Sequence, residues 1–297
     1  MADQPEQDPT DIFVRHRNLL FTIAYEMLGS AADAEDVLQE TWLRWVGVDH
    51  QEVRDPRAYL VRMVTRQSLT QLRTLGRRKE AYVGSWLPEP LLTSPDVAED
   101  VELAESVSMA MLLVLETLSP TERAVFVLRE VFDVGYDEIA VAVDKSQDAV
   151  RQIAHRARNH VQAQRPRSTV SSDEAGRALE AFRKAIETGE FEDLLSLIAP
   201  DVVLIGDGGG IKQAVLNPIR GARRVSKLLS TGLVQYGARL TVESVLINGW
   251  PAVMLRFDGE LDTVIAVRID DGMITGLYAV RNPEKLARLD RETILSR

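Results

Sequence analysis

The sequence contains no cysteine and only four histidines among its 297 residues. The lack of cysteine excludes disulfides, thiolate zinc sites and cysteine nucleophiles. No apolar run is long enough to span a membrane, and the first ten residues are polar and acidic, unlike a secretory signal. We therefore expect a cytoplasmic chain that has no metal or other cofactor and does not bind a membrane. Its length predicts two or three domains.

Acidic residues outnumber basic ones, 45 to 35, so the formal net charge is −10. This balance argues against a protein that coats nucleic acid indiscriminately. The basic residues are unevenly distributed, however. Six of them and no acid lie between Arg62 and Lys79, residues 80–122 carry nine acids and no Lys or Arg, and residues 145–167 are basic again. Two basic patches around an acidic stretch are typical of a protein that touches a polyanion at two places.

Helical spacing of apolar residues predicts helices over residues 11–80 and 97–163. Ser119 and Pro120 provide a cap and a first position for one of these helices, which we expect to end at Gly135. We expect the helix after Gly29 to bury its tryptophans and to turn one polar face to solvent. That face carries Asp36, Gln39, Glu40 and Leu43.

Residues 81–100 contain three prolines and are interpreted as a linker. The run from Tyr82 to Leu92 is too apolar for a linker that moves freely in water, because it includes a tryptophan and three leucines. We therefore expect this segment to dock on another part of the protein.

The segment Tyr136–Arg158 combines a short helix, a tight turn and a second, basic helix. Arginine and glutamine can bridge base-edge atoms, and arginine also binds phosphate. The candidate DNA-reading side chains are Arg151, Gln152, His155 and Arg156. Two interpretations remain open for this segment alone: a helix-turn-helix, or an ordinary helical hairpin with a solvated basic face whose turn lacks the usual glycine.

After a polar boundary at residues 164–172, the pattern changes to an α+β domain. Two helices are predicted over 173–188 and 190–199, followed by a strand over 202–205 and a helix over 220–234. Strand patterns then cover 240–247, 252–257, 261–269 and 273–280, with a hairpin signal at Asp270-Asp271-Gly272.

Three motifs in the first 163 residues resemble the extracytoplasmic-function (ECF) sigma factors of bacterial RNA polymerase. The acidic segment 33–44 is similar to the polymerase-binding helix of sigma region two. Residues 56–60, 64–66 and 72–73 resemble the minus-ten recognition region, although many relatives have Asn where Arg66 stands and Asp near Thr70. Residues 118–126 and 136–140 resemble sigma region four.

The resemblance implies a set of roles. Asp36, Gln39, Glu40 and Leu43 would bind the clamp helices of the β′ subunit, and region four would meet the β flap. The loop 47–55 would hold a flipped base. Arg57, Arg62, Arg66 and Arg73 would lie near the melted minus-ten strand. Arg151, Gln152, His155 and Arg156 would face the minus-thirty-five duplex.

The C-terminal part resembles a SnoaL-like domain of the nuclear-transport-factor-two-like superfamily, an extension found in a subgroup of these sigma factors. The expected organisation is region two at 8–80, a linker at 81–100, region four at 101–165 and the SnoaL-like domain at 173–286. Three motifs mark the subgroup: Trp86-Leu87-Pro88-Glu89-Pro90, Asp207-Gly208-Gly209-Gly210 and Asn282-Pro283-Glu284-Lys285-Leu286. Relatives tend to have a basic residue directly after the glycines, whereas here Ile211 precedes Lys212. The resemblance implies that the extension contacts the linker and region two and holds the DNA-binding regions in a compact, less active arrangement.

Catalysis by the extension is the alternative, because SnoaL-like relatives include polyketide cyclases with an acid–base residue in the pocket. No histidine lies in this domain, and the acids Asp207, Asp258 and Asp262 are interpreted as turn or rim residues. We therefore expect no catalytic residue, but consider a small-molecule ligand in the pocket of the fold. A second hypothesis for the whole chain is a SnoaL-like enzyme or ligand-binding protein fused to a DNA-binding regulator that does not bind core polymerase.

Overall fold

The computed structural model describes residues 8–164, 172–190, 193–234 and 239–297. The chain divides into two compact units. The first unit contains the described residues up to Arg78, Val114–Gln164 and Ile294–Arg297. The second unit contains Lys79–Leu113 and the described residues between Ser172 and Thr293. No helix in the described ranges is both long and apolar enough to cross a membrane.

The first unit begins with three helices whose ends follow from local capping. They are α1 (Pro9–Leu28), α2 (Ala31–Trp45) and α3 (Pro56–Glu80), the last of which continues into the second unit. Gly29 adopts a positive φ of 69° to end α1, and the Ser30 hydroxyl accepts a hydrogen bond from the Asp33 N–H to begin α2. Apolar residues of α1 and α2, among them Trp45, pack into the core of this unit.

The remaining helices of the first unit are α7 (Pro120–Phe126), α8 (Tyr136–Val143) and α9 (Gln147–Gln164). The predicted cap at Ser119 and Pro120 is confirmed, with Glu122 completing a capping box. The expected end at Gly135 is wrong. The helix widens into a π-helix over Val127–Val131, and Gly135 is instead the N-cap of α8.

The second unit is built on one six-stranded sheet in the order β2-β1-β6-β5-β4-β3. The strands are β1 (Ile198–Asp207), β2 (Ile219–Arg220), β3 (Leu240–Ile247), β4 (Trp250–Phe257), β5 (Glu260–Asp270) and β6 (Met273–Val280). Strands β3 to β6 form an antiparallel meander, and β1 runs parallel to β6. The predicted α+β class is confirmed.

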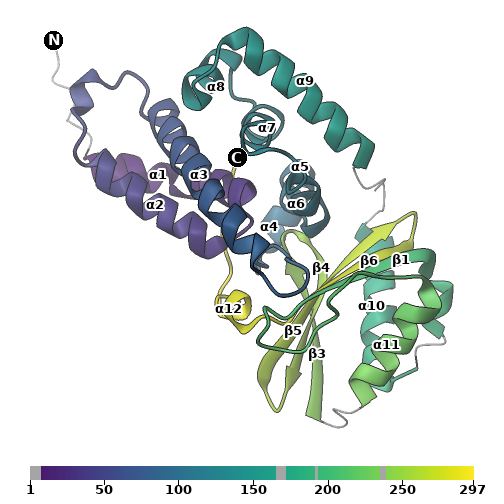
Figure 1. Cartoon of the computed structure of the whole chain (residues 1–297). Helices are drawn as coiled ribbons and strands as arrows, with labels where there is room; N and C mark the ends of the chain where they lie inside the picture. The colour runs from purple at the N-terminus through teal and green to yellow at the C-terminus, as the bar shows by residue number, and fades with distance from the viewer. Residues whose placement is uncertain (1–7, 165–171, 191–192, 235–238) are drawn as a thin grey trace. The chain divides into compact units, whose positions relative to one another are not determined.

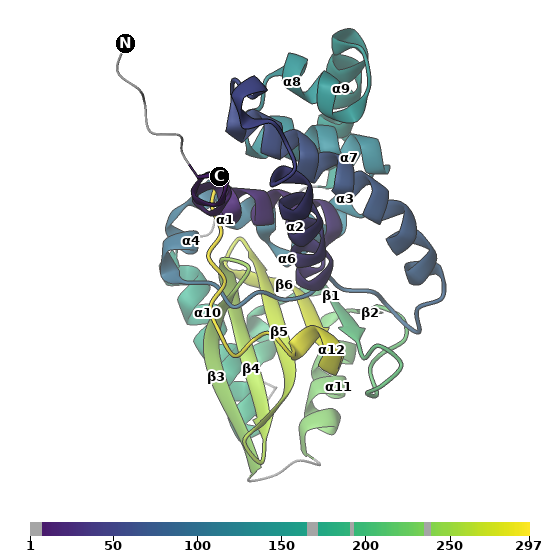
Figure 2. The same ribbon diagram turned by 90° about the vertical axis from the view of Figure 1, so that its left-hand side faces the viewer.

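Side chains alternate between the two faces of this sheet, as the period of a β-strand requires. On the first face, α10 (Ser172–Thr188) and α11 (Ala222–Val234) cover a core that includes Val253 and Leu255 (Figures 1 and 2). On the second face, Ala252 and Met254 belong to a separate core that includes Leu87 of the linker.

The linker and the chain after it, as far as Leu113, therefore belong to the second unit. The segment around Leu92 pairs with the end of β3, and α4 (Pro95–Glu99), α5 (Val101–Val107) and α6 (Met109–Leu115) follow. The predicted docking of this apolar segment is confirmed, because Leu87 is completely buried. The helical region predicted from residue 97 onward is divided at Asp100 and at Ser108, and Ser108 caps α6 by accepting a hydrogen bond from the Met111 N–H.

The helix predicted over 190–199 is also wrong. Within the described residues, a short 3-10 helix occupies Asp193–Ser196, and β1 already begins at Ile198. The apolar residues of this stretch serve a strand because Ile198 and Val202 both reach the core on the first face of the sheet.

Candidate functional site

The exposed face of α2 carries the four side chains predicted to bind polymerase. Asp36, Gln39, Glu40 and Leu43 are all exposed, whereas the opposite face of the helix is buried. Glu40 pairs with Arg44 at 2.9 Å, but both side chains are about half exposed, so this ion pair contributes little. Leu43 is 59 % exposed among these polar neighbours. The result is an acidic face with one apolar side chain available to a partner.

The basic side chains of α3 fall into two groups. Arg57 and Arg73 are exposed, and the guanidinium of Arg62 lies 4.6 Å from the centre of the Tyr59 ring. Arg66 is also exposed, but it donates hydrogen bonds to the backbone carbonyls of Val141 at 2.8 Å and Ala142 at 3.4 Å. These carbonyls end α8, where the helix dipole favours a cation. Arg66 therefore links the two helical regions of the first unit.

A second link between these regions is the buried guanidinium of Arg123 on α7. It donates to the Glu26 carbonyl at 2.9 Å and pairs with the Glu116 carboxylate at 2.8 Å. Burying a guanidinium is costly unless it is paired and hydrogen-bonded, and both conditions are met here. The part of region four from Val114 onward is thus packed against region two within the first unit.

Helices α8 and α9 form a helix-turn-helix without a glycine in the turn. Asp144 adopts the left-handed conformation, with φ of 54°, and its neighbour Lys145 donates its N–H to the Ala140 carbonyl at 3.0 Å. Aspartate tolerates this conformation better than most residues, so glycine is not required. The Ser146 hydroxyl accepts from the Ala149 N–H at 3.2 Å and begins α9.

The predicted DNA-reading side chains share one exposed face of α9. They are Arg151, Gln152, His155 and Arg156. Spacings of one, three and four residues place them together on a helix surface. Arg158 points elsewhere and forms two hydrogen bonds with the Glu130 carboxylate, at 3.0 and 2.7 Å. The face that remains is polar and basic and has the chemistry to contact a nucleic acid duplex.

The three short motifs of the linker and the extension meet at Asp207, at the end of β1. Its carboxylate accepts hydrogen bonds from the Tyr82 hydroxyl at 2.5 Å, the Leu87 N–H at 2.9 Å, the Gly209 N–H at 3.0 Å and the Lys285 ammonium at 2.7 Å. The side chain of Asp207 is completely buried. The expectation that Asp207 is a turn or rim residue is therefore wrong, because its charge is compensated in the interior.

Lys285, on the short helix α12 (Pro283–Leu286), completes this arrangement. Its ammonium donates to the Leu87 carbonyl at 2.5 Å and lies 3.4 Å from the centre of the Trp86 ring. Burial lowers the pKa of Lys285 to about 8, although the charge and hydrogen bond of Asp207 oppose that shift. Burial, together with the hydrogen bond and charge of Asp207, raises the pKa of Tyr82.

Asn282 and the glycines after Asp207 allow the linker, the end of β1 and the segment before α12 to approach one another this closely. The Asn282 amide donates to the Tyr82 hydroxyl at 2.9 Å, and its N–H donates to the Asp207 carbonyl at 3.0 Å. A Cβ atom on Gly208 would lie 2.0 Å from the Lys212 carbonyl oxygen, and one on Gly209 would lie 2.4 Å from the Asn282 amide nitrogen. We call Asp207, Lys285, Asn282, Tyr82 and Trp86 the Asp207 cluster.

Other members of the predicted motifs contribute by burial. Pro88, Glu89 and Pro90 are buried, and the half-buried Pro283 begins α12. Gly210 has a positive φ of 71°, and a Cβ atom added to it would lie 3.2 Å from the Cβ atom of Val83. Motif residues from three separate parts of the chain thus lie together in the second unit.

Sequence reasoning missed a second contact between the linker and the extension, at Asn248. Its side-chain oxygen accepts from the Leu91 N–H at 3.0 Å, and its amide donates to the Val107 carbonyl at 2.9 Å. The Trp250 indole also donates to the Ala104 carbonyl at 2.9 Å. In the sequence, Asn248-Gly249 has only the signature of a hairpin turn, so nothing there indicated this role.

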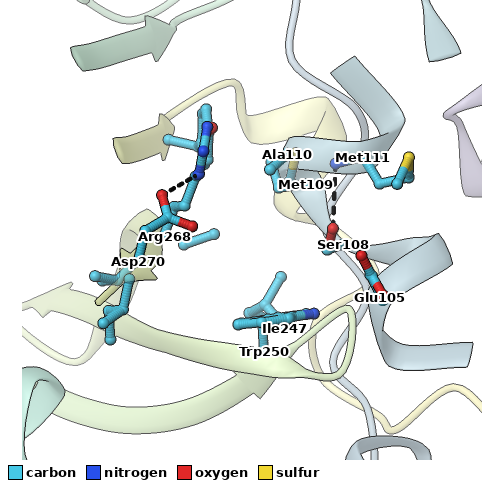
Figure 3. Close-up of a pocket in the computed structure, with 13 residues that line it drawn as sticks. Glu105, Ser108, Met109, Ala110, Met111, Ile247, Trp250, Arg268 and Asp270 are labelled. Atoms are coloured by element: carbon cyan, nitrogen blue, oxygen red, sulfur yellow. Dashed lines mark hydrogen bonds and ion pairs between the residues drawn. The ribbon is translucent and has the colours of Figure 1, made fainter. Parts of the chain in front are cut away.

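A small hollow lies where α5 and α6 meet the second face of the sheet (Figure 3). Its lining includes Met109, Trp250 and the ion pair of Arg268 with Asp270. The Arg268 Nε atom lies 2.7 Å from the Asp270 Oδ2 atom. The hollow has a volume of about 30 Å³, which accommodates water rather than an organic ligand. It marks close packing of the post-linker helices on the sheet.

The remaining candidate acids, Asp258 and Asp262, lie in separate surroundings. Asp258 is exposed in a turn with φ of 53°. Asp262 pairs with Lys212 at 2.8 Å and with Arg281 at 2.9 Å. Within the described residues, no group of three or more histidine or acidic side chains could hold a metal ion.

Comparison with known proteins supports the two helical regions separately. Residues 12–78 match the family model for Sigma-70 region 2, and residues 108–161 match that for Sigma-70 region 4. The chain is 36% identical over 283 residues to the ECF RNA polymerase sigma factor SigJ of Mycobacterium tuberculosis, covering 91% of this chain and 90% of SigJ. It is 30% identical to the probable ECF RNA polymerase sigma factor SigI of the same organism, covering 97% and 98%.

The similarity extends to the solved structures and includes the extension. The crystal structure of Mycobacterium tuberculosis SigJ matches with a TM-score of 0.75 and 33% identity, and the match covers 95% of this chain and 99% of that one. Fold and surface features together define a sigma-70-type transcription initiation factor with a SnoaL-like C-terminal domain. More specifically, the chain belongs to the family of ECF RNA polymerase sigma factors.

Membership of this family makes the chain an alternative sigma factor, which acts with core RNA polymerase at promoter DNA to begin transcription. The family consists of transcription factors rather than enzymes. The hypothesis of a DNA-binding regulator that does not bind core polymerase is therefore set aside.

Proposed function

We propose that this sigma factor is modulated in cis by its SnoaL-like domain, which fixes the linker between the two DNA-binding regions. The observation that carries the proposal is the Asp207 cluster, where a buried carboxylate and a buried ammonium bind the backbone of the linker at Leu87. The linker joins region two to region four in the sequence, so any restraint on it limits how these regions separate on a promoter.

The contact of Arg66 supports the same proposal from within the first unit. Arg66 is one of the side chains proposed to lie near the minus-ten strand, yet it is hydrogen-bonded to the end of α8 in region four. In this arrangement its side chain is exposed, but its Nε and Nη2 groups already donate to region four. We infer that promoter binding requires region two and region four to part, and that the restrained linker opposes this step.

For polymerase binding, we propose that Asp36, Gln39, Glu40 and Leu43 contact the clamp helices of the β′ subunit, and that region four meets the β flap. Acidic side chains around one exposed leucine suit a basic surface with an apolar centre. For DNA, we propose that Arg57, Arg62 and Arg73 lie near the melted minus-ten strand, with Arg66 joining them after release. The exposed face of α9 would then read the minus-thirty-five duplex.

We further propose that the chain works in the cytoplasm, where core polymerase is found, and that its extension has no catalytic role. A second function, sensing of a small molecule, is favoured by a cavity on the first face of the sheet.

The polymerase contact can be tested by reversing charge on α2. Replacing Asp36→Arg together with Glu40→Arg should lower the affinity for core polymerase by at least about tenfold, a loss equivalent to 1.4 kcal/mol, and abolish run-off transcripts. Asp11→Arg is a matched control, because Asp11 is also an exposed helical acid of the first unit. Unchanged binding by the double variant, or an equal loss in the control, would contradict the assignment.

A further inference from the structure

The first face of the sheet contains a cavity with room for an organic ligand. It lies between the sheet and α11 and has a volume of about 600 Å³, within the range of sites that hold small molecules. Its apolar lining comes from strands and helix alike: Leu204, Leu228, Leu229, Leu255, Phe257 and Ile265. The hollow on the second face is about 30 Å³, so the cavity under α11 is the better candidate of the two.

Three charged side chains stand among these apolar groups. The Lys212 ammonium pairs with one carboxylate oxygen of Asp262, and the Arg281 guanidinium pairs with the other. Arg281 also donates to the Gln213 carbonyl at 2.7 Å. Lys212 is the most exposed of the three, at 33 %, and Asp262 the least, at 15 %. Two positive charges therefore face one negative charge at the partly open side of the cavity.

The carboxylate of Asp262 is held in its negatively charged form by its neighbours. Burial alone would raise its pKa, but hydrogen bonds from Lys212 and Thr263 and the charge of Arg281 outweigh burial and lower it. Asp262 thus remains ionised, and the three side chains carry one net positive charge. Lys212 has three N–H donors and Arg281 has five, so both can donate to a further acceptor. One additional carboxylate would neutralise the group.

We propose that this cavity binds an amphipathic organic anion, with an apolar body under α11 and a carboxylate held by Lys212 and Arg281. A neutral or cationic ligand would leave the net positive charge uncompensated in a partly buried place. A small hydrophilic anion would leave the apolar lining unfilled.

The charged group is connected directly to the Asp207 cluster. Lys212 donates its N–H to the Gly208 carbonyl at 3.0 Å, and Arg281 donates its N–H to the Asp207 carbonyl at 2.7 Å. Each of them therefore lies on a segment that also contributes to holding the linker. A carboxylate that draws Lys212 and Arg281 away from Asp262 would act on those segments. This coupling rests on the proposed role of the extension, whereas ligand binding itself does not.

The binding test uses the full chain and decanoate as the probe, with decanol, decyltrimethylammonium and acetate as comparison compounds in calorimetry. We expect decanoate to bind at least about tenfold more tightly than each of the others. Lys212→Met should remove the preference for decanoate over decanol. Arg239→Met is the control, because Arg239 also pairs with an aspartate of the second unit, Asp258, but does not line the cavity.

A second variant keeps the proposal testable if Lys212→Met folds poorly. Gly232 lines the cavity from α11, and a Cβ added there meets nothing within 4 Å. Gly232→Leu should fill the cavity and abolish decanoate binding, while favouring the helix because glycine is a poor helix former. Gly176→Leu is its control on α10, where an added Cβ also meets nothing within 4 Å.

Hydrogen exchange of residues 82–91 then tests the coupling, since the Leu87 N–H is bonded to Asp207. We expect decanoate to change exchange there in the wild type and in Gly176→Leu, but not in Gly232→Leu. Equal binding of decanol, or unaltered binding by Gly232→Leu, overturns the proposed site and leaves the proposed restraint on the linker intact. Tight binding of decanoate with unchanged exchange overturns the coupling alone.

Discussion

Asp207 illustrates how much of a residue's role depends on partners that are distant in the sequence. The glycine-rich motif after β1 was recognisable, and so were the motifs at Trp86 and Lys285. Their meeting point was not, because the donors to Asp207 lie 120, 125 and 78 residues away at Leu87, Tyr82 and Lys285. A carboxylate before glycines is more often an exposed turn residue, and only the fold shows that this one is buried.

Removing the charge of Asp207 should destabilise the second unit. Asp207→Asn leaves the buried ammonium of Lys285 without a counter-charge, and we expect the free energy of unfolding to fall by about 3 kcal/mol. Urea unfolding measures this change. Asp258→Asn is the control, since Asp258 is exposed and asparagine tolerates its positive φ, and its effect should stay within about 0.5 kcal/mol. Similar midpoints for both variants would show that the Asp207 cluster is not a stabilising contact.

Lys285 should make the contact with Trp86 sensitive to pH. Because its pKa is about 8 in the folded chain, against an ordinary value of 10.5, the folded state loses this proton first as the pH rises. Between these two values the unfolded state binds more protons, so this group makes the free energy of unfolding increase with pH across that window. Below pH 8 both states are protonated, and the group adds no pH dependence.

The same titration should be visible in tryptophan fluorescence, because the ammonium of Lys285 lies over the Trp86 ring. We expect a transition with a midpoint near pH 8 in the wild type. Lys285→Arg should lack it, since a guanidinium stays charged throughout this range. A wild-type signal without a transition near that pH, or an equal transition in Lys285→Arg, would contradict the description of Lys285.

At the scale of elements, regular patterns were predictable and interruptions were not. The strands from Leu240 to Val280 were found because their residues alternate between two buried faces or end in clear turns. The break at Ser108 and the π-helix over Val127–Val131 were missed, because apolar residues continue through both. The face of α2 was predictable because helical periodicity separates its buried and exposed residues. The hydrogen bond from Arg66 to α8 was not, because it depends on packing between helices.

Arg66→Ala tests that packing. The substitution removes two hydrogen bonds to the last turn of α8, each contributing about 1 kcal/mol. We expect amide exchange in α8 to accelerate by up to about thirtyfold, because the loss of both bonds amounts to about 2 kcal/mol and each 1.4 kcal/mol is a factor of ten. Arg73→Ala, which changes an exposed arginine of the same helix, should leave exchange in α8 unaltered. Equal exchange in the two variants would argue against a link between the regions.

At the scale of the whole molecule, the division into units does not follow the order of the chain. The linker folds with the extension, although it lies between region two and region four in the sequence. The final residues Ile294–Arg297 belong to the first unit, where the Ser296 N–H donates to the Thr22 hydroxyl at 3.0 Å. The family resemblance predicted a contact of the extension with the linker. The placement of the last four residues was not predictable, because so short a segment has no periodicity.

Two neighbouring residues of this terminal segment offer a matched test. Leu295 is buried in the first unit, with 6 % exposure, whereas Ile294 is 64 % exposed. Leu295→Ala should lower the free energy of unfolding of the first unit by about 2 kcal/mol, measured by urea unfolding. Ile294→Ala should change it by no more than about 0.5 kcal/mol. If the two variants behave alike, the terminal segment does not pack on α1.

The central claim is that the extension restrains this sigma factor through the Asp207 cluster. Run-off transcription with core polymerase tests it most directly, comparing the full chain with Asp207→Asn and with Asp258→Asn at equal concentrations of folded protein. We predict that Asp207→Asn raises the transcript yield by about fivefold or more, a typical coupling between linked sites, and that Asp258→Asn does not. Equal yields from all three proteins, or a lower yield from Asp207→Asn, would contradict the claim.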